Sequence, residues 1–321
     1  MSNWQPSAPL KNLQIRARIL KQIRDFFAAR DVLEVDTPLM CRTSVTDPFI
    51  ESIPATFQAH GAQQTQQYYL QTSPEYAMKR LLANGSGPIY QICKAFRQGD
   101  VGQLHNPEFT MLEWYRPGFN HHQLMDEMDE LLQLVLQCKP AMRLSYRALF
   151  QTYLAIDPHT ASIAELAQCA ANQSIVVAGN ITDKDTWLDL LLTHCIEPQI
   201  GMDVPCFVYD FPASQAALAR IQAGDPPLAA RFEVYCRGME LANGFYELQD
   251  AREQRERFIR NLQRREELGL SSLPIDELFL AALEQGLPDC SGVALGVDRL
   301  MMVALKSNRI ADVLSFNFDK A

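Results

Sequence analysis

Two arginines in distant stretches of the sequence have neighbours suited to anion chemistry. Arg97 follows the apolar run 89–96 and precedes a Gly-containing loop, and Arg299 ends the stretch GVALGVDR at 292–299. A planar guanidinium group can hold a carboxylate and a phosphate together and stabilise the charge that develops as they react. Taken alone, a strand-end arginine is often a surface ion pair, and the second stretch also fits a capped core helix.

The stretch between them offers a possible ligand-binding face. Alternation over residues 107–116 predicts a strand with Phe109, Met111, Glu113 and Tyr115 on one side. The ring of Phe109 can stack on a nucleobase, and Glu113 and Tyr115 present oxygens to a polar or cationic ligand. A half-buried strand with a solvated acid is the alternative.

Apolar periodicity predicts the elements that position these residues. Residues 89–96 are typical of a neighbouring strand, and 292–296 of a strand that passes into a helix ending near Leu305. Gly296 permits close backbone approach, and Asp298 suits the helix start. An amphipathic helix is expected over 13–27, and the apolar spacing from Leu124 to Val135 predicts a core helix.

These motifs occur in the order of a known family. Residues 96–115 resemble the second signature of class II aminoacyl-tRNA synthetases, 292–299 the third, and 13–38 the first. The lysyl branch matches best, through Ser73-Pro74-Glu75, 105–115 and 231–251. The resemblance runs from about residue 11 to the C-terminus. It implies an α+β fold, a mainly antiparallel sheet flanked by helices, a single catalytic domain over 1–321, and a homodimer formed through the first signature.

The length of the chain narrows the resemblance. A lysyl-tRNA synthetase carries an N-terminal anticodon-binding domain of roughly 100 residues, whereas the first signature here begins almost at once. We therefore expect no anticodon-binding domain. The chain is similar to free-standing lysyl-synthetase paralogues that activate (R)-β-lysine and transfer it to a lysine side chain of elongation factor P. That similarity implies ATP as a substrate, Mg²⁺ as a cofactor, elongation factor P as a partner, and no tRNA.

The resemblance also assigns roles to individual residues. Arg97 and Arg299 are the implied catalytic residues, and Glu233 and Glu240 are the implied Mg²⁺ ligands. The implied substrate-binding residues are Ser73, Pro74, Glu75, Glu113, Tyr115, Asn243, Glu247 and Ala294. The implied ATP-binding residues are Arg97, Gln98, Gly99, His105, Asn106, Phe109, Glu240, Leu241, Gly296 and Arg299.

The acids among these residues favour a cationic substrate. Carboxylates gathered in one site raise one another's pKa unless cations arrive. Lysine and β-lysine each bring two ammonium groups, whereas asparagine and aspartate do not. This difference sets aside the related tRNA-free asparagine synthetases.

Three positions depart from the family pattern. Gly99 stands where the family usually has glutamate, with Asp100 next in line as a substitute, and Leu104 stands where lysyl-tRNA synthetases carry arginine. Ala294 replaces a glycine. Its added methyl group is expected to disfavour one placement of the substrate amino group, and so to weaken selection of α-lysine.

Composition bounds the remaining possibilities. A net charge of −9 argues against a broad nucleic-acid footprint, and the eight scattered cysteines include no CxxC pair that would indicate zinc or a disulfide framework. No apolar run reaches membrane-spanning length and the N-terminus lacks a signal core, so a reduced cytoplasmic protein without a membrane partner is expected. The charged segment 251–267 is expected to form a solvated helix, and the pair His121-His122 to lie on the surface.

Two other functions stay open at this point. One is a truncated synthetase that charges RNA with lysine, and the other is a catalytically silent paralogue that regulates another protein. The retained charges of Arg97, Glu233, Glu240 and Arg299 argue against a silent protein, because such a cluster is costly without a ligand. The short acidic chain argues against RNA.

Overall fold

Two units, each with its own core, make up the chain. The computed structural model describes residues 4–177, 179 and 181–321. The first unit contains the residues up to 118 together with 249–290 and 294–321, and the second contains 119–248 with 291–293. The single domain expected over 1–321 stays a prediction.

The first unit contains the stretches that resemble the first and second family signatures, together with residues 294–299 of the third. Its helices are α1 (Leu10–Ala28), α2 (Glu75–Ala83), α7 (Ala251–Glu267), α8 (Glu277–Gly286) and α9 (Val297–Leu305). Its strands are β1 (Leu33–Glu34), β2 (Met40–Cys41), β3 (Pro54–Phe57), β4 (Gln66–Leu70), β5 (Ile89–Phe96) and β6 (Glu108–Pro117), and β12 (Cys290–Gly296) ends in it. Short 3₁₀ turns follow at Ile310–Asp312 and Phe318–Lys320.

Strands β1, β5, β6 and β12 lie in that order in a sheet, and β2, β4 and β3 form a second, smaller one. Strand β5 pairs antiparallel with β6 along its whole length, from Ile89 opposite Tyr115 to Phe96 opposite Glu108. Aromatic rings cover one face of this pair. The Phe27 ring of α1 stacks on Tyr90 with 4.4 Å between centroids and meets the edge of the fully buried Trp114. The amphipathic pattern predicted over 13–27 thus becomes a helix whose apolar side lies on the strands.

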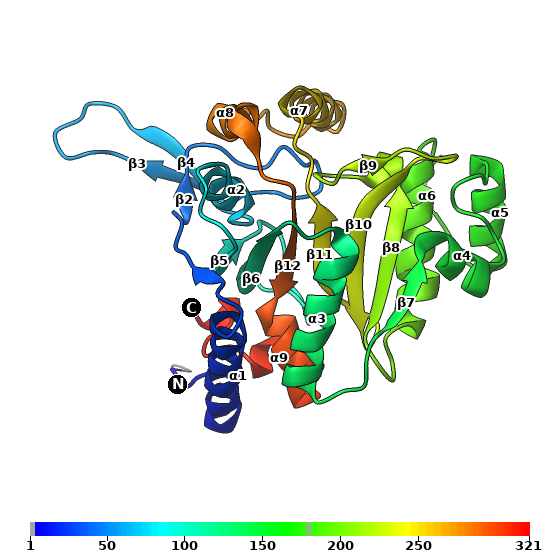
Figure 1. The fold of residues 1–321 in the computed structure, drawn as a ribbon, viewed down its shortest axis with the longest axis horizontal. Coiled ribbons are helices and arrows are strands. Elements are labelled where there is room, and N and C mark those ends of the chain that lie inside the picture. Colours follow the sequence, from blue (N-terminus) through cyan, green and yellow to red (C-terminus); the bar gives the residue numbers. More distant parts are fainter. Residues whose placement is uncertain (1–3, 178, 180) are drawn as a thin grey trace. The chain divides into compact units, whose positions relative to one another are not determined.

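The two ends of the described chain lie side by side next to α1 (Figure 1). The Ser7 backbone N–H donates to Ser315 O at 2.8 Å, and the Ser7 hydroxyl donates to the Asn317 side chain at 2.8 Å. The segment after α9 is therefore held against the start of the chain.

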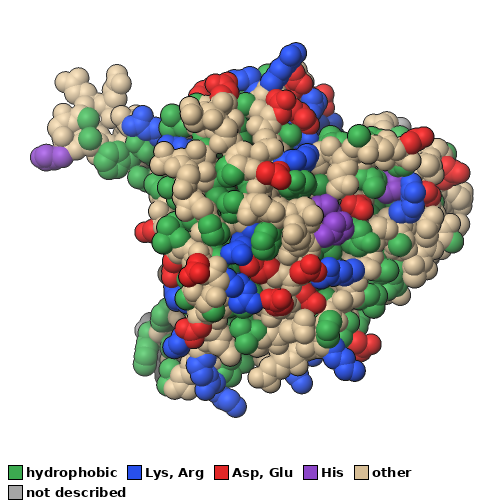
Figure 2. All heavy atoms as spheres, viewed as in Figure 1, with side chains coloured by type: hydrophobic (Ala, Val, Ile, Leu, Met, Phe, Trp, Pro, Cys, Tyr) green, Lys and Arg blue, Asp and Glu red, His purple; other side chains and the backbone are tan. Residues whose placement is uncertain are grey.

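The hairpin formed by β3 and β4 projects from the first unit (Figure 1). Residues 54–70 contain no Asp, Glu, Lys or Arg, and Figure 2 shows green and tan over the outer part of the hairpin, with purple for histidine at its end. The hairpin differs in this respect from the rest of the acidic chain, where charged side chains are frequent.

The second unit combines a mainly antiparallel sheet, in which only β7 pairs parallel with β8 among the described strands, with flanking helices. Its helices are α3 (His121–Leu136), α4 (Tyr146–Leu154), α5 (Ile163–Asn172) and α6 (Lys184–Leu191), followed by short turns at Leu192–Ile196, Glu197–Gln199 and Ala213–Gln215. Its strands are β7 (Met142–Ser145), β8 (Cys206–Pro212), β9 (Ile221–Gln222), β10 (Leu228–Cys236) and β11 (Met239–Tyr246). Their order is β11, β10, β8, β7, with β9 beside β10.

Helices cover this sheet. Helix α3 lies along β10 and β11 (Figure 1), and a capping box between Asn120 and Gln123 fixes its start. A second core forms where α4, α5 and α6 pack on the strands, with the fully buried rings of Tyr146 and Phe150 stacked at 4.7 Å. With both units built mainly from antiparallel strands and flanking helices, the predicted α+β class is confirmed.

Two β-bulges change which residues share a face of the second sheet. In the pairing of β10 with β11, Val234 lies opposite Ala242 but Tyr235 lies opposite Glu240, which leaves Leu241 as an extra residue. In the pairing of β10 with β8, the register shifts at Asp210, whose φ is 60°. One extra residue reverses the alternation of every residue beyond it.

Two surface expectations hold only in part, because His122 is exposed and α7 has the predicted bounds, but His121 and Arg265 are buried. His121 is 3 % exposed because its ring packs beside Tyr246, with 6.3 Å between centroids. In α7, Arg265 is 0 % exposed because Nη2 forms an ion pair with Glu51 Oε1 at 2.6 Å. The predicted core positions Leu124, Met128, Leu131 and Val135 are buried, as expected. In the described part of the chain, no helix is long and apolar enough to cross a membrane.

Candidate active site

Arg97 and Arg299 lie around one histidine in the first unit. Arg299 Nη2 is 2.6 Å from His105 Nε2. Burial, then the charge of Arg299 and that of Arg97, lower the pKa of His105, so its neutral ring can accept the Arg299 hydrogen. The Arg97 guanidinium carbon lies 5.2 Å from the centroid of the Phe109 ring. The two predicted catalytic guanidinium groups thus both act on His105, and that of Arg97 lies beside the ring predicted to stack on adenine.

The loop after Arg97 explains one departure from the family pattern. Gly99 has φ 85°, a left-handed conformation that a glutamate would adopt only with strain. Asp100 acts on His105 in the opposite sense to the arginines, raising its pKa, and is therefore close to the same charges. Gln98 is fixed by its backbone N–H, which donates to Glu51 O at 2.8 Å.

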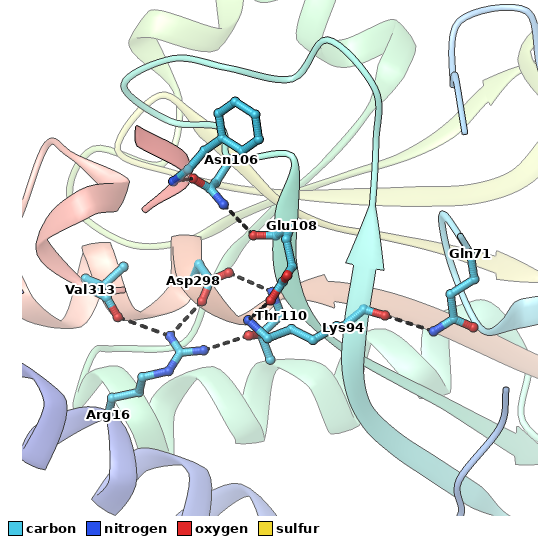
Figure 3. Close-up of polar contacts among 9 residues, drawn as sticks. Arg16, Gln71, Lys94, Asn106, Glu108, Thr110, Asp298 and Val313 are labelled. Carbon is cyan, nitrogen blue, oxygen red and sulfur yellow. Dashed lines mark hydrogen bonds and ion pairs between the residues drawn. The ribbon is translucent and has the colours of Figure 1, made fainter. Parts of the chain in front are cut away.

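Helix α9 is attached to β6 by the buried carboxylate of Asp298 (Figure 3). Asp298 Oδ2 accepts the Thr110 backbone N–H at 2.7 Å, and Arg16 Nη1 of α1 lies 2.6 Å from Asp298 Oδ1. Arg16 also donates to the Thr110 hydroxyl at 2.8 Å. Asp298 lies in the first helical turn, as predicted, but its carboxylate ties the helix to the strand and Gly296 occupies the capping position. This attachment fixes the backbone that bears Arg299.

Asn106 joins the end of the chain to the start of β6 (Figure 3). Its amide nitrogen donates to Glu108 O at 2.7 Å, and its oxygen accepts the Phe318 backbone N–H at 2.9 Å. One amide hydrogen is not used in these two bonds, which leaves Asn106 a donor for the predicted nucleotide contact.

A second group in the first unit, the Glu113 cluster, consists of Ser73, Glu75, Lys79, Glu113 and Tyr115. Glu113 is 2 % exposed and accepts from the Tyr115 hydroxyl on Oε1 and from the Ser73 hydroxyl on Oε2, both at 2.7 Å. Burial and the nearby charge of Glu75 raise the pKa of Glu113 to about 8, although the two hydroxyl donors and Lys79 lower it. The predicted mutual repulsion of substrate-binding acids is therefore present.

Lys79 is a member of this cluster that the sequence prediction missed. Its Nζ lies 2.6 Å from Glu75 Oε1, and its side chain is 1 % exposed. The spacing of four residues on α2 brings the two groups together. That Glu-x-x-x-Lys spacing was visible in the sequence, but it is also typical of exposed helix surfaces.

A third group, the Glu233 cluster, lies in the second unit and consists of Glu197, Arg231, Glu233, Tyr235 and Glu240. Arg231 Nη2 forms a short ion pair with Glu233 Oε1, and the Tyr235 hydroxyl donates to Glu233 Oε2 at 2.5 Å. Residues 231, 233 and 235 of β10 share a face by alternation. Arg231 also donates to the Asn243 side chain at 3.2 Å.

The bulge at Leu241 brings Glu240 onto the same face. Simple alternation would place Glu240 and Asn243 on opposite sides of β11, yet Glu240 pairs with Tyr235 and Asn243 pairs with Glu233. Burial and the charges of Glu233 and Glu240 raise the pKa of Glu197 to about 7. Three carboxylates therefore act on one another here.

This donor set fits a magnesium ion. Within the described residues, no group of three or more His, Cys, Asp or Glu side chains could hold a metal alone. Mg²⁺ is usually held by one or two carboxylates with phosphate oxygens and water completing its shell. Glu233 and Glu240 supply two hard oxygen donors, and the mutual repulsion evident at Glu197 would be relieved by a divalent cation.

The remaining predicted residues are likewise divided between the first and the second unit. Glu247 is 1 % exposed and lies just beyond β11, with its backbone oxygen accepting from Arg220. Leu241 is buried, and Ala294 is half-buried in β12. Pro74 is the residue that precedes α2. Sequence reasoning missed Arg16, Lys79, Arg231 and Tyr235, which act by holding predicted residues.

Comparisons with known proteins agree with this arrangement. The family described as "tRNA synthetases class II (D, K and N)" matches residues 5–320. A protein of Edwardsiella ictaluri is 54 % identical over 322 residues, covering 100 % of this chain and 99 % of its own length. Proteins of Salmonella arizonae and Sodalis glossinidius are each 52 % identical over 321 residues, with the same coverage. All three are named elongation factor P–(R)-β-lysine ligase. The chain belongs to the class II tRNA synthetase family of the D, K and N type.

Proposed function

We propose that this protein is an ATP-dependent ligase that activates (R)-β-lysine as an aminoacyl-adenylate and transfers it to a lysine side chain of elongation factor P in the cytoplasm. Full-length relatives at 52 to 54 % identity that bear this name support the assignment. The main structural support is Glu113, a buried carboxyl group beside a second acid, which a cationic substrate would stabilise in its charged form.

The first step is formation of the adenylate. The substrate carboxylate attacks the α-phosphorus of ATP, a new phosphorus–oxygen bond forms, and pyrophosphate leaves. Arg97 and Arg299 offset the negative charge that builds on the phosphoryl oxygens. Phe109 stacks on adenine, and His105 and Asn106 bind the nucleotide from the loop. Gln98, Gly99, Leu241 and Gly296 are the proposed backbone contacts.

The second step transfers the aminoacyl group. The neutral amine of the acceptor lysine attacks the activated carbonyl carbon, an amide bond forms, and AMP leaves with the electron pair of the broken carbon–oxygen bond. The proton lost by the amine passes to phosphate or solvent. No covalent enzyme intermediate is needed.

Carboxylates and hydroxyls recognise the substrate amines. We assign Glu75, Glu113 and Tyr115 to one ammonium group, with Ser73 and Pro74 shaping their placement, and Asn243 and Glu247 to further polar contacts. Ala294 restricts the position of the amino group through its methyl. Magnesium, held by Glu233 and Glu240, would neutralise phosphate charge.

We also propose a homodimer that does not use tRNA. Several large apolar side chains between residues 10 and 49 are exposed, including Leu10, Leu33, Met40 and Phe49, and such surfaces are typical of association sites. The net charge of −9 disfavours broad contact with RNA.

An ATP–pyrophosphate exchange panel of amino acids, followed by intact-mass measurement of elongation factor P, tests the function. Exchange should be fastest with (R)-β-lysine, and the acceptor should gain the mass of one β-lysyl group. Arg97→Ala should lower exchange by about 10²-fold or more. Arg252→Ala is a matched control because Arg252 is 90 % exposed. Exchange that Arg97→Ala leaves unchanged, or an acceptor of unchanged mass, would contradict the proposal.

A further inference from the structure

Lys79 is an ammonium group already present beside the proposed substrate-binding acids. Its side chain is 1 % exposed and its Nζ lies 2.6 Å from Glu75 Oε1, while Glu75 keeps 14 % of its side chain exposed. The Nζ also lies 5.7 Å from the centroid of the Phe279 ring. Burial favours the neutral form of a lysine unless an anion accompanies it. Lys79 and Glu75 therefore form an ion pair whose lysine is buried.

Glu113 lacks a comparable cation of its own. Its two oxygens accept from the hydroxyl groups of Tyr115 and Ser73, both neutral donors. The Ser73 hydroxyl accepts the Glu75 backbone N–H at 3.0 Å, so its own hydrogen points to Glu113. The cluster thus contains two carboxyl groups and one ammonium group, and that ammonium is bonded to Glu75.

The other titratable groups around Glu113 add no further charge to the two carboxyl groups and one ammonium group of the cluster. Cys93 faces it from β5, where burial and then the charge of Glu113 raise the pKa of the thiol to about 12, so the thiol is neutral. Tyr115 is a neutral phenol that donates to Oε1. From α2, Glu75 raises and Lys79 lowers the pKa of Glu113.

We propose that Lys79 is a positioning residue that pairs with Glu75 and thereby leaves Glu113 as the group that releases a proton when the substrate ammonium enters. The inference rests on the proposed function, since it assigns a substrate amine to this cluster.

The charge of the cluster is the same before and after the substrate ammonium group binds. In the empty cluster Glu113 carries a proton while its oxygens accept from the Tyr115 and Ser73 hydroxyl groups. When the substrate ammonium arrives, the Glu113 O–H bond breaks, the proton leaves to solvent, and the two hydroxyl groups continue to donate to the carboxylate. One proton leaves for each ammonium group that enters. A pKa of about 8 for Glu113 agrees with a protonated empty cluster at neutral pH.

The first test compares Lys79→Gln with Lys79→Arg in exchange assays from pH 6.5 to 9. Lys79 lowers the pKa of Glu113, so without the Lys79 charge Glu113 holds its proton more tightly. The KM for β-lysine of Lys79→Gln should therefore rise about 10-fold to 100-fold at pH 7 and approach the wild-type value at pH 9. The kcat and the KM for ATP should stay within about threefold of wild type, and Lys79→Arg should restore the wild-type pH profile. A KM unchanged at pH 7, or raised equally at every pH, would overturn the proposal.

The second test uses the unaltered full-length protein and applies even if the Lys79 variants do not fold. Calorimetric titration with β-lysine at pH 7, in two buffers of different ionisation enthalpy, gives the number of protons released. We expect close to one proton at pH 7 and a smaller number at pH 9. Binding without proton release would refute the inference while leaving the proposed function intact. Absence of both binding and exchange with β-lysine would instead refute the proposed function.

Discussion

The Glu113 cluster and the Glu233 cluster bury acids in different ways. In the first, a lysine one helical turn away neutralises Glu75, and Glu113 keeps only neutral hydroxyl donors. In the second, Arg231 and Tyr235 alternate with Glu233 along one strand, and a bulge adds Glu240. The Glu113 cluster contains one ammonium group for two carboxyl groups, whereas the Glu233 cluster contains three carboxyl groups. The first is therefore suited to an ammonium group, and the second to a divalent cation.

The largest expected effect concerns the stability of the empty protein. Between pH 4.5 and about 8 the folded state keeps the Glu113 proton that the unfolded state releases, so the free energy of unfolding falls as pH rises through this window. Glu113→Gln removes this dependence and should be more stable than wild type at pH 8.5 by on the order of 5 kcal/mol.

Denaturant unfolding from pH 5 to 8.5, without ligands, measures this difference. Glu256→Gln is a matched control, because Glu256 is 53 % exposed and should retain the wild-type slope. Parallel curves for wild type and Glu113→Gln would mean that Glu113 is ionised in the empty protein.

The second-largest expected effect distinguishes the two clusters by the cation that each is proposed to bind, which is Mg²⁺ for the Glu233 cluster and the substrate ammonium group for the Glu113 cluster. Glu240→Gln removes one oxygen charge proposed for magnesium and should lower exchange by about 10²-fold at low Mg²⁺, with partial recovery as Mg²⁺ is raised. Glu113→Gln should instead raise the KM for β-lysine, and added Mg²⁺ should not restore it. Titration of exchange activity with Mg²⁺ at fixed ATP measures both. Equal responses of the two variants to Mg²⁺ would remove the distinction between the clusters.

Local patterns were sufficient to predict several elements of the first unit. The strand at 89–96 and the helix ending at Leu305 have the predicted bounds, because largely apolar runs end there at polar residues. The shared face of Glu113 and Tyr115 follows from alternation, and their 2.7 Å hydrogen bond agrees with it.

Features that depend on distant partners could not be predicted in this way. The face of Glu240 depends on the bulge at Leu241, which is a property of the pairing between two strands. Arg265 is buried because Glu51, 214 residues away in sequence, accepts its hydrogen bond. His121 is buried against Tyr246 for a similar reason. Each case reverses an expectation drawn from residue type alone.

The third effect concerns discrimination between isomers. Ala294→Gly removes a methyl group where lysyl-tRNA synthetases have glycine, and should shift preference toward α-lysine by about 1 to 3 kcal/mol. The ratio of exchange rates with α-lysine and (R)-β-lysine measures this shift, and the Mg²⁺ dependence should stay at its wild-type value. An unchanged ratio would mean that the methyl group does not select the isomer and that the carboxyl groups of the Glu113 cluster do.

The smallest expected effect is the loss of stability when an exposed Lys–Glu ion pair is broken, and it serves as the reference for the buried Lys79–Glu75 pair. Lys94 Nζ lies 3.1 Å from Glu108 Oε1, with side chains 40 % and 51 % exposed (Figure 3). Water already solvates both charges, so Lys94→Gln should change the free energy of unfolding by less than about 1 kcal/mol. Lys79→Gln leaves Glu75 without its cation inside the protein and should cost more. Denaturant unfolding of both variants at pH 7 makes the comparison, and equal losses would show that burial does not distinguish the two pairs.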